Sequence, residues 1–233
     1  MPKLPDPAQK NPEEKKGHAT NIIQRLRKQF PSAKIVLNFS NHWELLVAVI
    51  LSAQCTDKKV NEVTEKLFMK YRTLEDYIKV SQEEFEKDIH STGFFRAKAK
   101  NILAAAKMLK EKFGGKLPKT IAEMITLPGV ARKTANVVLG NAYGIFEGIA
   151  VDTHVRRLSQ RLGLSSQNNP VKIEQDLMNL IPKKDWFQTT YLLINHGRAI
   201  CTAKDPRCDL CPLKSICPSA FKFPRFKKVD NKK

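Results

Sequence analysis

Four of the five cysteines in this 233-residue chain lie close together near its C-terminal end. They are Cys201, Cys208, Cys211 and Cys217, in a C-x6-C-x2-C-x5-C pattern. Four thiolates suit either a tetrahedral zinc ion or an iron–sulfur cluster. Zinc sites usually pair two C-x2-C knuckles, and this segment has one, so the wide and uneven loops favour a [4Fe–4S] cluster. The segment is therefore predicted to fold around a metal site, with Cys55 left over as a core thiol.

The composition is that of a globular chain. Hydrophobic residues make up 42%, which excludes a disordered chain, and 10 Gly and 13 Pro exclude a collagen-like one. The longest purely apolar run, residues 45–51, is far shorter than the ~20 residues that span a bilayer. The N-terminus lacks the hydrophobic stretch of a signal peptide. We therefore expect a cytoplasmic protein that does not bind membranes.

The charge balance indicates a polyanionic partner. Lys and Arg number 41 against 23 Asp and Glu, a formal net charge of +18. About one third of this surplus lies in residues 1–17 and from Lys222 onward, so the folded part carries most of it. That distribution favours a face that binds nucleic acid, whereas the alternative is a solvated lysine-rich surface that aids solubility.

Helix start and stop signals recur along the chain, and no period-2 strand pattern is found, so the fold is predicted to be all-α. The helix predicted over residues 42–53 is apolar on all sides and belongs at the centre of a bundle. A capping box is predicted at Ser81–Glu84. Residues 1–17 are predicted to be a flexible leader and residues 221–233 a basic tail. Other helix starts are predicted at Asn41, Thr56, Thr120 and Asp152, and a stop at Gly114-Gly115.

A tight turn between two predicted helices is a candidate nucleic-acid contact. The turn is Leu127-Pro128-Gly129-Val130, and the second helix begins near Ala131. Backbone N–H groups at such a turn and at a helix start lack internal partners and suit a phosphate oxygen. The alternative is an ordinary turn between packed helices.

Lys133 and Asp152 are candidate catalytic residues. Lys133 lies in the first turn of the second helix beside Arg132, where the helix dipole and the neighbouring cation favour a neutral amine. Such an amine can form a Schiff base with a sugar aldehyde. The Asp152 carboxylate can stabilise positive charge developing on a sugar ring. The simpler alternatives are a phosphate-binding or solvated lysine and a plain N-cap.

Together these segments resemble the endonuclease III family of DNA repair glycosylases. The matching stretches are LSAQCTD at 51–57, LPGVARKTANVV at 127–138, VDTH at 151–154, HGR at 196–198 and the cysteine spacing. The resemblance covers about residues 20–220. It implies a bilobal helix-hairpin-helix DNA glycosylase fold, with a DNA groove between the lobes. A six-helix barrel lobe would span 35–146 and hold the hairpin motif at about 121–142, while 18–34 plus 147–220 would form the iron–sulfur cluster lobe.

The resemblance also implies roles for single residues. Lys133 matches the catalytic lysine and Asp152 the catalytic aspartate. Gln54 matches the residue that fills the gap left by an extruded base. Phe94 stands where the family places an apolar wedge, and its alternative is a core Phe near a helix end. The residues expected to bind DNA are Gln54, Phe94, Leu127, Gly129, Ala131, Arg132, His154, Lys204, Arg207 and Lys214.

Ala131 stands where many members of the family have a second hairpin glycine. Its Cβ is harmless if the residue is helical. His154, like His196, would by default be a structural hydrogen-bonding residue rather than a ligand.

The implied function is that of a bifunctional base-excision repair enzyme. Its N-glycosylase releases oxidised pyrimidines from duplex DNA, and its AP lyase cleaves 3′ to the abasic site by β-elimination. We expect a monomer, nucleoid-associated if the host is bacterial. One alternative is a monofunctional adenine glycosylase, although such enzymes usually lack this lysine and carry an extra C-terminal domain. A non-catalytic DNA-binding or redox-sensing protein is the other alternative, and the presence of both Lys133 and Asp152 argues against it.

Overall fold

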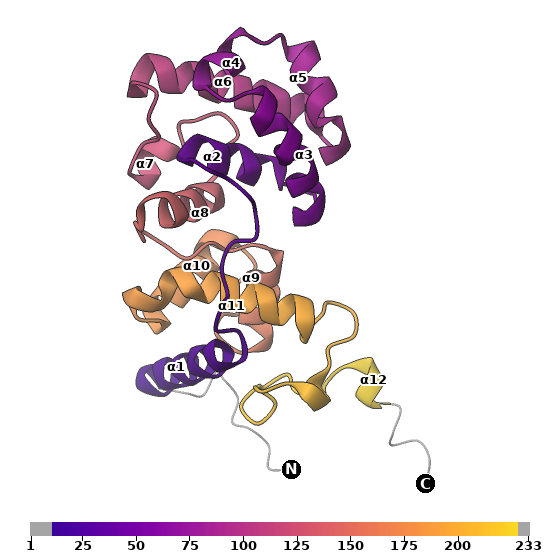
Figure 1. Cartoon of the computed structure of the whole chain (residues 1–233). Coiled ribbons are helices and arrows are strands. Elements are labelled where there is room, and N and C mark those ends of the chain that lie inside the picture. Colours follow the sequence, from indigo (N-terminus) through magenta and orange to yellow (C-terminus); the bar gives the residue numbers. More distant parts are fainter. Residues whose placement is uncertain (1–10, 228–233) are drawn as a thin grey trace. The chain divides into compact units, whose positions relative to one another are not determined.

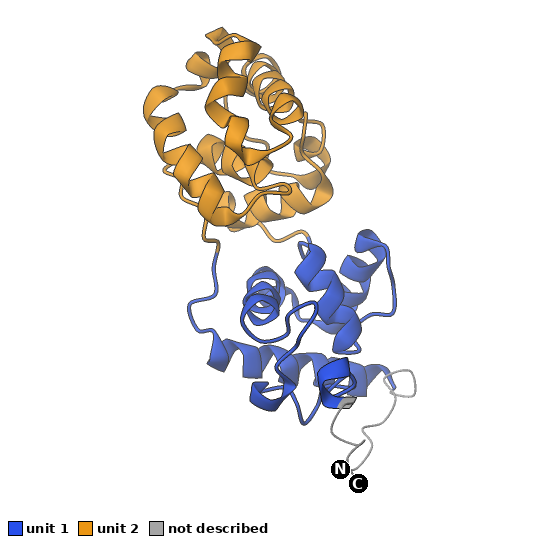
Figure 2. Ribbon diagram, turned by 90° about the vertical axis from the view of Figure 1, so that its right-hand side faces the viewer, with its two compact units in different colours: residues 1–34, 148–233 blue, residues 35–147 orange. Residues whose placement is uncertain are grey.

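The computed structural model of the chain describes residues 11–227, which contain helices and no strand (Figure 1). The all-α prediction is confirmed. The chain divides into two compact units, of which unit 1 is made of residues 1–34 and 148–233 and unit 2 of residues 35–147 (Figure 2). Each unit has a hydrophobic core of its own. Unit 1 is therefore assembled from both ends of the chain, whereas unit 2 is one continuous segment.

The elements of unit 2 are α2 (His42–Leu51), α3 (Asp57–Lys70), α4 (Leu74–Lys79), α5 (Gln82–Ile89), the 3₁₀ turn η2 (His90–Thr92), α6 (Phe95–Phe113), α7 (Ile121–Met124) and α8 (Arg132–Tyr143). Helix α2 is the predicted apolar helix, and every residue from Glu44 to Leu51 is buried. It ends two residues before the predicted limit, since the chain turns at Ser52. A helix without a polar face is stable only when neighbours cover it, and α3, α6 and α8 pack on α2.

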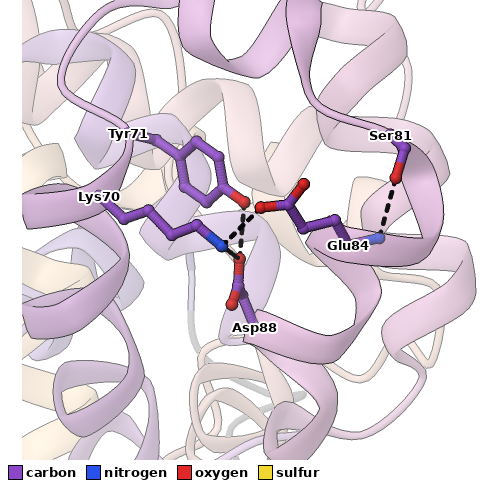
Figure 3. A network of polar contacts seen from close by, with 5 residues as sticks. All are labelled: Lys70, Tyr71, Ser81, Glu84 and Asp88. Carbon is purple, nitrogen blue, oxygen red and sulfur yellow. Dashed lines mark hydrogen bonds and ion pairs between the residues drawn. The ribbon is translucent and has the colours of Figure 1, made fainter.

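The start of α5 differs from its prediction (Figure 3). The Ser81 Oγ accepts the Glu84 N–H at 3.2 Å, so the N-cap is present. The Glu84 carboxylate, however, lies 2.9 Å from the Lys70 Nζ and does not complete a capping box. Lys70 also donates to Asp88 at 2.7 Å, and the Tyr71 hydroxyl donates to the same carboxylate at 2.6 Å. Glu84 thus contributes to a network that joins the end of α3 to α5.

The elements of unit 1 are α1 (Pro12–Gln29), α9 (Thr153–Arg161), α10 (Pro170–Leu180), the 3₁₀ turn η3 (Lys183–Asp185), α11 (Trp186–Ala199), the 3₁₀ turn η4 (Cys208–Leu210) and α12 (Pro224–Lys227). Helix α1 begins inside the predicted leader. The reason is a complete capping box, in which Asn11 and Glu14 each accept the other's backbone N–H at 2.9 Å. The helical residues 12–17 therefore correct the leader prediction, and its residues 1–10 lie outside the described part.

The predicted basic tail is also partly structured, because α12 lies within it. The remaining residues of the tail, 228–233, lie outside the described range.

Candidate DNA-binding surface and metal centre

The turn between α7 and α8 in unit 2 forms a tight hairpin. The Leu127 carbonyl accepts the Val130 N–H at 3.1 Å, and Gly129 has a φ of 78°. Glycine enters this left-handed region without a steric penalty. A Cβ on Gly129 would lie 2.9 Å from the Cβ of Asn101 on α6, so the turn packs directly on that helix. Asn101 is a residue that the sequence analysis missed, because no local pattern relates it to the hairpin.

Ala131 is the N-cap of α8, with φ −87° and ψ 167°. Its backbone is extended, whereas the sequence analysis made the tolerance of its Cβ depend on a helical backbone. Extended backbone accepts a Cβ equally well, so the hairpin does not require a second glycine here. Alanine has no side-chain oxygen to cap the first N–H groups of α8, and groups of this kind suit an anion.

The side chains around the hairpin differ in their exposure. Lys133 is exposed in the first turn of α8, and Arg132 beside it is half-buried. The Leu127 side chain is 2% exposed and belongs to the core of unit 2. Any contact of Leu127 with DNA is therefore limited to its backbone, because its side chain faces the core.

Gln54 and Phe94 share an unusual backbone conformation. Gln54 lies in the turn after α2 with a φ of 53°, and Phe94 precedes α6 with a φ of 49°. Among the described residues, Phe221 is the only other non-glycine residue with a positive φ. This conformation costs roughly 1–2 kcal/mol per residue and is enriched at functional sites. Gln54 is exposed and Phe94 is 71% exposed, so the alternative of a core Phe94 is wrong.

In unit 1, Asp152 is the N-cap of α9. Its Oδ1 accepts the Val155 N–H at 2.8 Å, and the side chain is half-buried. The plain N-cap alternative is thus present in the structure. The same hydrogen bond fixes the orientation of the carboxylate, which a group that stabilises charge also requires.

His154 and Arg157 on α9 lie against Gly197 on α11. The Arg157 Nη2 lies 3.2 Å from the His154 Nδ1 and donates to the carbonyls of Gly197 and Cys201, both at 3.1 Å. A Cβ on Gly197 would lie 2.9 Å from the His154 Nδ1. The glycine of the HGR stretch therefore permits the close approach of α9 and α11, and His154 is held inside this contact.

The four clustered cysteines line one cavity in unit 1, together with Arg161, His196 and Phe223. The Arg161 Nη1 donates to the Cys201 Sγ at 3.3 Å, and the Leu213 N–H donates to the Cys211 Sγ at 3.4 Å. N–H groups directed at sulfur stabilise thiolate ligands and tune an iron–sulfur cluster. Arg161 was not singled out from the sequence, although its position on α9 places it beside the cysteine loop.

Burial shifts the pKa values of three side chains that line this cavity. It raises the pKa of Cys211 to about 11 and that of Cys217 to about 12. It lowers the pKa of His196, whose Nε2 lies 3.6 Å from the Cys211 Sγ, to about 4. A metal group would have to displace the thiol protons. Within residues 11–227, no set of three or more His, Cys, Asp or Glu side chains is arranged to hold a single metal ion.

The cysteine loop carries three basic residues. Lys204 and Arg207 are exposed, whereas the exposed Lys214 donates from its Nζ to the Asp209 carbonyl at 2.9 Å. Cys55 lies in unit 2, half-buried against the core. The structure thus gathers the cysteines, Asp152 and His154 in unit 1. It gathers the hairpin, Lys133, Gln54 and Phe94 in unit 2.

Comparison with known proteins places these features in one family. Residues 47–183 match the HhH-GPD superfamily of base excision DNA repair proteins. The chain is 52% identical to endonuclease III of Synechocystis sp. over 206 residues, which cover 88% of this chain and 94% of the relative. It is also similar to two solved structures, a non-covalent endonuclease III–DNA complex and a trapped endonuclease III–DNA covalent intermediate. Each has a TM-score of 0.85 and 46% identity, over 89% of this chain and 97% of the other.

No helix within residues 11–227 combines the length and apolar character needed to cross a bilayer.

Proposed function

The chain belongs to the endonuclease III family of the HhH-GPD superfamily, and from this membership we propose that it excises oxidised pyrimidines from duplex DNA. As a member of this family it is a DNA base-excision repair glycosylase with AP lyase activity. It acts as a monomer in the cytoplasm, on the nucleoid if the host is bacterial. The observation that carries the proposal is the exposed Lys133 in the first turn of α8, directly after the hairpin.

The reaction begins with extrusion of the damaged nucleotide from the duplex. Unstacking requires the least free energy for a damaged, poorly stacked base, which is one source of selectivity. Gln54 enters the vacated position and hydrogen-bonds the orphaned base of the opposite strand. Phe94 inserts its ring beside it as an apolar wedge. The left-handed backbone at both residues supports this assignment, because such strain is retained where it serves a site.

Lys133 is the nucleophile. Its neutral amine attacks C1′ of the extruded nucleotide, the C1′–N bond to the base breaks, and the base leaves with the bonding electron pair. The sugar ring opens and its former C1′ forms an imine with the Lys133 nitrogen. Removal of a C2′ proton then expels the 3′ phosphate by β-elimination, which cleaves the strand on the 3′ side.

Asp152 stabilises the positive charge that develops on the sugar while the base departs. Its carboxylate is already oriented by the hydrogen bond from Val155, so little reorganisation is needed when the charge appears. Phosphate contacts come from the backbone of the hairpin and from Arg132, Lys204 and Arg207. Contacts of this kind hold the duplex without reading its sequence.

Cys201, Cys208, Cys211 and Cys217 are the ligands of a [4Fe–4S] cluster. The support is chemical: four thiols line one cavity, and N–H groups of Arg161 and Leu213 are directed at two of the sulfurs. When bound, the cluster supplies four iron–thiolate bonds that hold the cysteine loop together. The loop then presents Lys204 and Arg207 to the DNA backbone.

The proposal is tested with purified protein on duplexes that carry one oxidised pyrimidine, one preformed abasic site, or no lesion. We expect base release and strand cleavage on the first, cleavage alone on the second, and neither on the third. Borohydride should trap a covalent protein–DNA adduct on both lesion duplexes. Base release without cleavage or trapping would instead indicate a monofunctional glycosylase.

A further inference from the structure

Lys98 is a buried lysine on α6 that none of the roles above requires. It is 5% exposed, and its Nζ donates to two backbone carbonyls, those of Leu51 and Thr92, each at 2.8 Å. Burial lowers the pKa of Lys98, opposed by the neighbouring Cys55. Burying a cationic side chain is unfavourable unless its hydrogen bonds compensate. The two carbonyls that Lys98 binds therefore explain why a lysine occupies this position.

Both carbonyls lie at the C-terminal ends of helical elements. Leu51 is the last residue of α2, and Thr92 is the last residue of η2. Carbonyls at such ends lack intrahelical donors, and the dipole of α2 adds partial negative charge there. A charged donor forms the stronger class of hydrogen bond with them. One ammonium group thus fixes the ends of two elements that are 41 residues apart in sequence.

The chain continues from each of these ends to a proposed DNA-intercalating residue. Gln54 is three residues beyond Leu51, and Phe94 is two residues beyond Thr92. The Phe94 carbonyl also accepts the backbone N–H of Lys98 at 3.1 Å. Gln54 and Phe94 both have left-handed backbone conformations and exposed side chains. Their own side chains therefore do not anchor these turns in the core. Lys98 contacts the backbone immediately before each of the two turns.

We infer that Lys98 is a positioning residue, which sets the spacing of Gln54 and Phe94 so that both enter the duplex together. The inference rests on the proposed function for the roles of these two residues. The same helix supports the hairpin, because Asn101, three residues further along, packs against Gly129. Helix α6 therefore provides a common base for three loops of unit 2.

The first test measures the loops themselves and does not depend on activity. Lys98→Met keeps an unbranched side chain of similar length but removes the hydrogen-bond donor. In this variant, amide hydrogen exchange should accelerate at residues 52–55 and 90–95. Exchange at the hairpin, residues 125–131, should stay within twofold of wild type, since Asn101 is unchanged. Lys98→Arg retains a cationic donor and should exchange more slowly in both loops than Lys98→Met. Unchanged exchange in both loops of Lys98→Met would overturn the inference.

The second test separates positioning from a general loss of stability. Lys98→Met should slow release of an oxidised pyrimidine at least tenfold, while cleavage of a preformed abasic site stays within threefold, because no base has to be expelled there. Leu109→Ala, a buried change three turns further along α6, controls for lost packing and should leave the ratio of the two rates unchanged. In a Gln54→Ala, Phe94→Ala background, adding Lys98→Met should slow base release less than twofold further.

The outcomes distinguish this inference from the proposed function. Equal slowing on both substrates, or full additivity with the double variant, would overturn the positioning role. A wild-type protein that releases no oxidised pyrimidine would refute the proposed function. The exchange test would still report whether Lys98 holds the two loops.

Discussion

The two units of the molecule achieve order in different ways. Unit 2 is one continuous segment whose helices surround the apolar α2, and its core holds more buried apolar side chains among the described residues than that of unit 1. Unit 1 combines both ends of the chain. Its stretch from Cys201 to Phe223 contains only one short 3₁₀ turn, η4, and places four thiols around a cavity. Burial of apolar surface explains the order of unit 2, whereas the cysteine segment of unit 1 offers four thiols to the proposed metal group.

The same division separates the proposed chemistry. In that proposal unit 2 carries Lys133 as the nucleophile, the hairpin, Gln54 as the residue that fills the gap left by the base, and Phe94 as the wedge. Unit 1 carries the charge-stabilising Asp152 and the basic cysteine loop. The two proposed catalytic residues thus lie in different units, and variants in the two units should fail in different ways.

The largest expected effect separates the two proposed catalytic residues. Lys133→Gln should abolish strand cleavage, because no amine remains to form the imine. Asp152→Asn should slow base release by roughly 10²–10³-fold, the scale of losing one electrostatic stabiliser. Single-turnover rates on a duplex with an oxidised pyrimidine measure both.

DNA affinity is the control for this pair. It should stay within about tenfold of wild type in each variant, since a lost surface charge contact is worth about 1 kcal/mol. Collapse of binding in Lys133→Gln would make that residue a phosphate clamp and would remove the bifunctional mechanism.

The next effect tests the metal centre. Purified protein should contain about four irons per chain and absorb broadly near ~400 nm. Cys201→Ser should lower iron content and remove exchange protection from α9, α11 and the cysteine loop, because a structural metal group contributes directly to folding. Helices α2 to α8 should keep their protection. Stoichiometric zinc in protein purified without oxygen would contradict the assignment of an iron–sulfur cluster. Equal loss of protection in both units would show that the effect of the cysteines is not confined to unit 1.

A matched pair of hairpin variants should give smaller effects. Gly129→Ala places a Cβ at a φ of 78° and 2.9 Å from Asn101, and it should destabilise unit 2 by roughly 1–2 kcal/mol. DNA affinity should fall with it. Ala131→Gly changes an extended N-cap, where glycine is accepted at least as well as alanine, and should be nearly neutral. Urea denaturation and a DNA-binding titration check both, and equal effects of the two changes would show that the hairpin does not depend on its left-handed turn.

The smallest effect concerns the network between α3 and α5 in Figure 3. Lys70→Met removes two ion pairs from a side chain that is 44% exposed, so the stability of unit 2 should fall by about 1 kcal/mol or less. Asp88 keeps its hydrogen bond from the Tyr71 hydroxyl. Excision and abasic cleavage should be unchanged. A loss of activity larger than the loss of stability would give this network a role in DNA binding.

Features carried by neighbouring residues were predictable from the sequence. The apolar run of α2, the N-caps at Thr56 and Asp152, and the stop at Gly114 each depend on a few adjacent positions, and the structure contains all of them. The hairpin turn also follows from its Pro-Gly pair.

Features that depend on distant partners were not predictable in this way. The Glu84 carboxylate pairs with Lys70, fourteen residues away in the chain, and does not complete the predicted capping box. Gly129 packs against Asn101, which is distant in sequence. Lys98 joins the carbonyls of Leu51 and Thr92, which precede Gln54 and Phe94, and no local sequence pattern marks Lys98 for this role. The start of α1 inside the predicted leader was missed for another reason. The capping box at Asn11 is a local signal, but it lies within a Pro- and Lys-rich stretch that was interpreted as a flexible leader.

The most direct test of the account is to map the covalent bond to DNA. Protein is incubated with a duplex that contains a preformed abasic site, reduced with borohydride, digested, and sequenced by mass spectrometry. The proposed mechanism predicts a single modified peptide with the adduct on Lys133, absent from Lys133→Gln and formed more slowly in Asp152→Asn. An adduct on another amine, or trapping that persists in Lys133→Gln, would contradict it.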